Sequence, residues 1–170
     1  MWLDIILLMV LVICVITDIR YRRIYNIIIF PVISIALVSH LAIGGLEGLR
    51  FALLGFIVGF IILIIPYLMG GMGAGDVKLL ALIGTIKGMY FVINTALYMA
   101  IFGALIALVI MIFRKGVILR LKAIGYFVSC MRFGIKNSLW VDREGLQVTY
   151  PYGVAIALGT MFSFFGNGWF

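Results

Sequence analysis

Long apolar runs separated by short polar segments are the feature that most constrains the fold of this chain. A helix that crosses a membrane needs about 20 apolar residues, within a range of about 17–25. Runs of this kind occupy most of the 170 residues, of which 66% are hydrophobic and only 11% charged. A soluble domain of this size has too small an interior to hide that much apolar surface from water. The sequence therefore predicts an integral membrane protein and excludes a soluble enzyme, a disordered tail and a nucleic-acid-binding module.

Six apolar runs can be delimited along the chain. They cover residues 1–17, 24–43, 51–69, 77–86, 89–113 and 151–165. The fourth run is the shortest, so we expect it to be short, tilted or partly buried by its neighbours. Lipid offers the backbone no hydrogen bonds and no segment alternates with period two, so the runs are helices and not barrel strands. The predicted fold is all-α, a polytopic membrane protein with about six transmembrane helices in a single domain, residues 1–170. Within it, Gly55 and Gly59 have the spacing of close helix contacts.

The distribution of basic residues predicts the orientation of these helices. Cytoplasmic loops of membrane proteins carry an excess of Lys and Arg. If the N-terminus lies outside, 11 of the 13 basic residues fall in three cytoplasmic segments, residues 20–23, 76–78 and 114–150, and only Arg50 and Lys87 remain outside. The net charge of +7 then reflects topology, not an anionic partner. We therefore expect a multi-pass protein of the cytoplasmic membrane with a cytoplasmic loop at about 114–150.

Two of the six acidic residues lie where a polar segment meets a long apolar helix. Asp18 follows the first run and Asp76 precedes the fourth, so the two runs between them return both aspartates to one membrane face. Two carboxylates about 3 Å apart share a proton, so one can take a proton from water while its protonated partner polarises a carbonyl. Such a pair hydrolyses a peptide bond without a metal. The simpler alternatives are an interfacial ion pair of Asp18 with Arg20 or Arg22, and an N-cap role for Asp76.

Glycines precede Asp76 and add a second feature to this segment. Gly73 and Gly75 have no Cβ, so they tolerate positive φ and let another backbone approach closely. We expect a substrate strand laid across them to reach the Asp76 carboxylate, and the alternative is a flexible turn between two helices. The chain has neither an HExxH motif nor a His/Cys cluster, so we expect no metal and no cofactor. The single His40 is expected to pack or to form an interhelical hydrogen bond.

Both aspartate segments resemble the motifs of a known family. Residues 73–78, Gly-Ala-Gly-Asp-Val-Lys, are similar to the GxGD motif of the type IV prepilin peptidases, the A24 aspartic peptidases, in which the Asp is usually followed by x-Lys. Residues 18–26 are similar to the first aspartate motif of that family, D-x-R-x-x-x-I-P-N, with Tyr25 in place of the proline. Residues 151–155 resemble its final span. The resemblance covers nearly the whole chain.

The resemblance implies a membrane aspartyl endopeptidase that removes the basic leader of prepilin-like precursors (type IV pilins, pseudopilins or archaellins) at the cytoplasmic face. It implies Asp18 and Asp76 as the catalytic pair, with Gly73, Gly75 and Lys78 as supporting motif residues. The expected partners are this substrate, with its basic leader and apolar helix, and the lipid bilayer.

Because the chain lacks a cysteine-rich N-terminal region, it resembles the short, peptidase-only members found in tight-adherence (Flp) pilus systems and among archaeal preflagellin peptidases. Such members are not expected to methylate their products. Two alternatives of other classes stay open. One is a small proton- or cation-coupled transporter that uses the two aspartates, and the other is an assembly subunit without catalytic activity.

Overall fold

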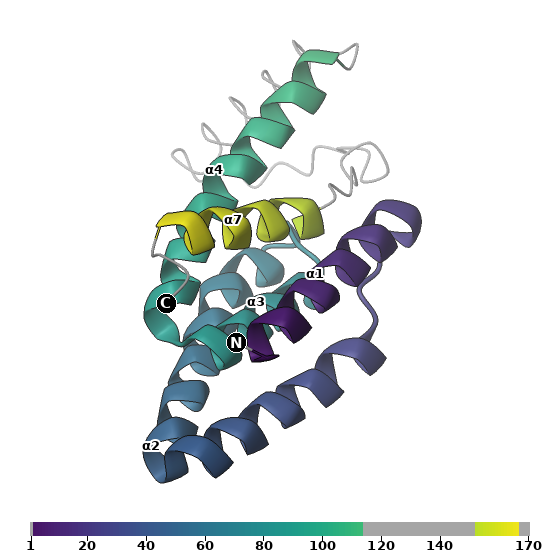
Figure 1. Ribbon diagram of the computed structural model, residues 1–170. Coiled ribbons are helices and arrows are strands. Elements are labelled where there is room, and N and C mark those ends of the chain that lie inside the picture. Colours follow the sequence, from purple (N-terminus) through teal and green to yellow (C-terminus); the bar gives the residue numbers. More distant parts are fainter. Residues whose placement is uncertain (1, 114–151, 167–170) are drawn as a thin grey trace. The chain divides into compact units, whose positions relative to one another are not determined.

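The computed structural model describes residues 2–113 and 152–166, and every element in this part of the chain is an α-helix (Figure 1). The helices are α1 (Trp2–Tyr21), α2 (Asn26–Leu68), α3 (Ala74–Lys87), α4 (Met89–Phe113) and α7 (Tyr152–Gly166). The chain divides into two compact units, residues 1–103 together with 151–170, and residues 104–150. The first unit holds both aspartates. The cytoplasmic loop expected at about 114–150 lies outside the described residues.

Three of the described helices are long and apolar enough to cross a membrane, namely α1, α2 and the segment Met89–Val109 of α4. At about 1.5 Å per residue, the 43 residues of α2 would extend about 65 Å, twice the thickness of a bilayer core. The helix is instead bent at Gly45, where φ is 57° and ψ −144°, and Figure 1 shows two arms that meet at this bend. The arms correspond to the second and third apolar runs. The all-helical class is therefore confirmed, whereas the number of six spans stays a prediction.

The fourth apolar run forms α3, which has only 14 residues and is about 21 Å long. Every residue from Leu79 to Ile86 is buried, and the helix contacts α1, α2 and α7. A helix too short to cross a bilayer alone is thus surrounded by its neighbours. This confirms the expectation that the fourth run is short and partly buried.

Small residues allow α3 to lie close to the second arm of α2. Gly55 and Gly84 face each other so closely that a Cβ on either residue would overlap the backbone oxygen of the other. A Cβ on Gly59 would lie 2.6 Å from the carbonyl oxygen of Leu80. The close helix contact predicted for Gly55 and Gly59 is therefore confirmed. The first arm of α2 adds a polar contact, because the His40 Nε2 atom lies 3.3 Å from the carbonyl oxygen of Ile86, which confirms the interhelical hydrogen bond.

Contacts at one end of the helices establish their relative directions. In α1, the Asp4 Oδ1 atom lies 2.8 Å from the Nζ atom of Lys87, the last residue of α3. The same ammonium group lies 4.7 Å from the ring centroid of Phe164, near the end of α7. Since Asp18 is at the other end of α1 and Asp76 at the start of α3, α1 and α3 are antiparallel. Both aspartates therefore lie at the same end of this helix pair, and the membrane face at which that end lies stays a prediction.

Candidate active site

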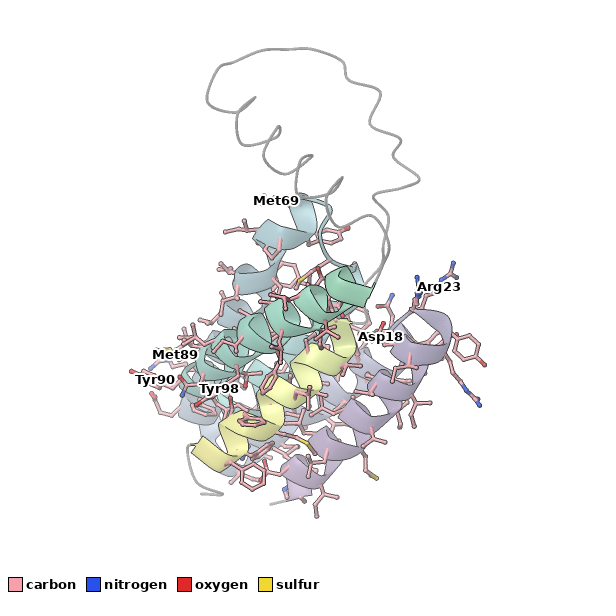
Figure 2. All side chains as sticks on the ribbon, turned by 90° about the horizontal axis from the view of Figure 1, so that it is seen from above. Asp18, Arg23, Met69, Met89, Tyr90 and Tyr98 are labelled. Carbon is pink, nitrogen blue, oxygen red and sulfur yellow. The ribbon has the colours of Figure 1, made fainter. Side chains whose placement is uncertain are left out.

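Asp18 lies in the last turn of α1, and only 7% of its surface is exposed. The helix continues beyond the apolar run, to Tyr21, and stops where Arg22 adopts a φ of 51°. The Arg22 N–H donates to the Asp18 carbonyl oxygen at 2.9 Å. This is an αL termination that costs a non-glycine residue roughly 1–2 kcal/mol. Figure 2 shows Asp18 where α1 meets the start of α7, with Arg23 turned outward. The strained turn thus ends the helix directly after the buried carboxylate.

The Asp18 carboxylate is held by a residue that is distant in the sequence. Its Oδ2 atom accepts the N–H of Gly153 at 2.8 Å. Gly153 is the second residue of α7, in the first turn, where backbone N–H groups have no partner within their own helix. A Cβ on Gly153 would lie 2.7 Å from the same oxygen, so the close approach requires glycine. Asp18 is therefore buried against α7, and the charge of Arg22, one of the partners in the ion-pair alternative, also acts on it.

Asp76 is the third residue of α3, and it too is only 7% exposed. Its Oδ2 atom accepts the N–H of Gly73 at 3.1 Å. The N-cap position belongs to Gly73, whose φ is −81° and ψ 148°, so the alternative in which Asp76 is itself the N-cap is wrong. Asp76 instead satisfies the N-cap N–H from within the first turn. Of the glycines in residues 70–75, Gly70 has a positive φ, 77°, whereas Gly73 and Gly75 do not use the positive φ that they could tolerate.

The two carboxylates act on each other through their charges. Asp76 lies outside the three helices that are long enough to span a membrane, and its pKa is raised to about 7, first by burial and second by the charge of Asp18. The buried Cys14, one turn before Asp18, is within reach of both charges. Interacting carboxylates titrate as a pair, so this pair can retain one proton near neutral pH. Across residues 2–113 and 152–166, no group of three or more His, Cys, Asp and Glu residues is placed to hold a metal ion.

Two further contacts join the segments that carry the aspartates. A Cβ on Gly75 would lie 2.7 Å from the Cβ of Ile24, so the missing side chain makes room for Ile24. The Lys78 Nζ atom donates to the Asn26 Oδ1 atom at 2.8 Å and lies 5.2 Å from the ring centroid of Phe30. The close approach at Gly75 is therefore made by another part of this chain. The start of α2 and the start of α3 are packed directly together.

Three residues of this arrangement, Ile24, Asn26 and Gly153, were not among the predicted site residues. Ile24 and Asn26 lie within residues 18–26, where their spacing from Asp18 was the available signal. The signal for Gly153 was weaker, its place within residues 151–155, which resemble the final span of the prepilin peptidase family. Tyr25 stands where the resembled motif has proline, and its φ of −82° is close to the −65° of that residue. The substitution therefore keeps the extended backbone that precedes α2.

Comparison with known protein families gives one result that covers both segments. A model of the type IV leader peptidase family matches residues 5–108, which is more than half of the chain. The matched range includes Asp18, Asp76 and the contacts between their segments, and it ends before α7. No curated protein and no solved structure matches the chain significantly.

Proposed function

Because the chain belongs to the type IV leader peptidase family, we propose that it is an aspartyl endopeptidase which removes the basic leader of prepilin-like precursors at the cytoplasmic membrane face. The observation that supports this most strongly is the arrangement of Asp18 and Asp76. Both are buried at the same end of α1 and α3, each accepts a backbone N–H, and the charge of one acts on the other. Such a pair has the properties that acid–base hydrolysis requires.

In the proposed reaction the ionised carboxylate takes a proton from a water molecule as the water oxygen attacks the carbonyl carbon of the scissile bond. The protonated carboxylate donates a hydrogen bond to the carbonyl oxygen, which carries the developing negative charge. When the C–N bond breaks, the leaving nitrogen takes up a proton from the pair. The products are a leader with a new carboxylate and a mature protein with a new amino group, so one water molecule is consumed.

The supporting motif residues are assigned roles in positioning Asp76. The Gly73 N–H orients the carboxylate, and Gly75 lets Ile24 pack against the first turn of α3. Lys78 connects α3 to α2 through its hydrogen bond to Asn26. None of these roles needs direct contact with the substrate.

The position of the aspartates favours a peptidase over the transporter alternative. Transporters place ionisable residues near the middle of the bilayer, whereas Asp18 lies in the last turn of α1 and Asp76 in the first turn of α3. A precursor with a basic leader and an apolar helix has its junction where lipid meets water. The bond to be cut therefore lies at the same depth as two carboxylates at helix ends.

The proposal can be tested by co-expressing the chain with a precursor whose basic leader ends in Gly before an apolar helix. We expect the precursor to be shortened at this junction, as read by mass spectrometry, and to remain intact in cells without the chain. An intact precursor beside well-accumulated, folded protein would reject the proposed function.

We expect cleavage to decrease as the pH rises through about 7. The pKa of Asp76 is raised to about 7, so this carboxyl holds its proton below that pH and loses it above. The pair needs one proton for catalysis, and its loss leaves two charged carboxylates and no acid. The measurement is kcat/KM for a leader peptide from pH 5 to 9, since this parameter reports the free enzyme. A rate that stays constant up to pH 9 would contradict the assignment.

Accessibility of introduced cysteines tests the proposed orientation. Arg23 lies at the aspartate end of the helices, whereas Glu47 lies beyond the first arm of α2, close to the bend at Gly45. In a chain whose Cys14 and Cys130 are replaced by alanine, we expect Glu47→Cys to react with an impermeant thiol reagent in intact cells. Arg23→Cys should react only in inside-out vesicles. Reaction of Arg23→Cys in intact cells would show that the site faces outward.

A further inference from the structure

We propose that the N-terminus of α7, through the N–H of Gly153, positions the Asp18 carboxylate and keeps it as the ionised member of the pair. This inference rests on the proposed function, because it names the residue that prepares Asp18 for it. Gly153 acts through Asp18 and is therefore a positioning residue.

The geometry at Gly153 carries the inference. The N–H donates to Oδ2 at 2.8 Å across 135 residues of sequence, and both residues are buried. Hydrogen bonds to a charged acceptor are shorter and stronger than neutral ones, so an N–H at this distance favours the ionised carboxylate. The partial positive charge at the start of a helix acts in the same direction. With one oxygen of Asp18 occupied by α7, the other oxygen is left to accept a proton from water.

The two aspartates differ in where their N–H donors come from. The donor for Asp76 is Gly73, three residues earlier, so this contact forms whenever α3 forms. The donor for Asp18 is supplied only when α7 docks against α1. The positive charge of Arg22 also acts on Asp18, and the negative charge of Asp18 acts on Asp76. Together these differences leave the shared proton on Asp76 and the negative charge on Asp18.

Contacts along α7 hold its first turn in place. Gly159 lies against the backbone of α4, where its Cβ would be 2.8 Å from the Thr95 carbonyl oxygen and from the Met99 nitrogen. The Thr95 Oγ1 atom donates to the Ser163 Oγ atom at 3.1 Å, and this bond is buried. At the far end, Phe164 contacts the ammonium group of Lys87. α7 is thus packed against its neighbours along its length, which supports the position of the Gly153 N–H at Asp18.

The first test replaces Gly153 by alanine. The new Cβ would lie 2.7 Å from the Asp18 Oδ2 atom, so the carboxylate must move and the hydrogen bond must lengthen. We expect kcat/KM to fall by about 10²-fold, the cost of displacing a catalytic group by about 1 Å. We also expect the acidic limb of the pH profile to move to higher pH, because a less stabilised Asp18 carboxylate takes up its proton more readily.

Gly159→Ala is the matched control. It adds a Cβ to the same helix, α7, within 2.8 Å of backbone atoms of α4, so it disturbs packing but does not contact Asp18. The dependence of its kcat/KM on pH should keep the shape of the wild-type profile, even if less of the variant protein accumulates. An unchanged profile shape in Gly153→Ala, or the same shift in both variants, would overturn the inference.

A second test does not depend on activity, or on Gly153→Ala being folded. A Cβ on Gly153 lies 3.1 Å from the Asp18 Cβ, close to the separation of about 3.5–4.5 Å found in disulfides. In a chain with Cys14 and Cys130 replaced by alanine, Asp18→Cys and Gly153→Cys together should form a disulfide, and Asp18→Cys with Gly159→Cys should not. The absence of the first disulfide would overturn the inference even if the wild-type chain cleaves precursors. If the wild-type chain cleaves nothing, the proposed function fails separately.

Discussion

Replacement of either aspartate by asparagine is expected to reduce leader cleavage by about 10³-fold, within the range by which acid–base groups contribute. Asparagine keeps the size of the side chain, and its oxygen can still accept the N–H of Gly153 or Gly73, but it cannot exchange a proton. In the proposed mechanism the two carboxylates act as one unit, so the double variant Asp18→Asn, Asp76→Asn should be scarcely less active than either single variant. The measurement is the initial rate of leader removal, normalised to the amount of folded protein.

The matched control for these variants is Glu47→Gln. This variant also replaces a carboxylate by an amide, but in an exposed residue. Glu47 lies in the second arm of α2 near its bend, and its carboxylate forms an ion pair with Arg50 at 2.8 Å. This variant should cleave at the wild-type rate. If the effects of Asp18→Asn and Asp76→Asn multiply in the double variant, the two residues act independently and the paired mechanism is wrong.

Gly84→Ala is expected to destabilise the folded protein by about 3 kcal/mol, the upper part of the range for overpacked sites. The added Cβ would overlap the Gly55 carbonyl oxygen, which cannot move without shifting the second arm of α2. α3 is buried along most of its length and also carries Asp76, so separating the two helices disturbs the site as well. Thermal unfolding in detergent measures the change.

Gly103→Ala serves as the control for this packing prediction. Gly103 is also a glycine within a helix, but a Cβ there would meet only the Ala155 Cβ atom, at an ordinary 3.9 Å. It should change the unfolding temperature little. Equal stability of Gly84→Ala and Gly103→Ala would show that the close contact between α2 and α3 is unimportant.

The helices were predictable because their apolar runs are long, and length is the property that a membrane imposes. Helix ends were less predictable. The first apolar run ends at residue 17, but α1 continues through Asp18 to Tyr21, because a charged residue at a membrane boundary need not end a helix. The helix ends instead at the turn where Arg22 has a positive φ. The bend at Gly45 was not predicted, because the sequence did not show that one helical element continues on both sides of the break between the second and third runs.

The site was predictable where its residues lie close in sequence. Asp18 and Asp76 could be selected because acidic residues are rare in this chain and these two adjoin apolar helices. The contact with Gly153 could not be predicted, because hydrophobic patterns do not say which helices pack together across 135 residues. For the same reason Gly75 was expected to admit a substrate, whereas it makes room for Ile24.

The central claim is that Asp18 and Asp76 form one metal-free catalytic pair that removes a basic leader. The most direct measurement is mass spectrometry of a prepilin-like precursor after incubation with the purified chain in lipid vesicles, with a chelator present. We predict a single cut between the leader and the apolar helix by the wild-type chain, and essentially intact precursor with folded Asp18→Asn or Asp76→Asn. Substantial leader removal by either folded variant, or cleavage that the chelator abolishes, would contradict the account.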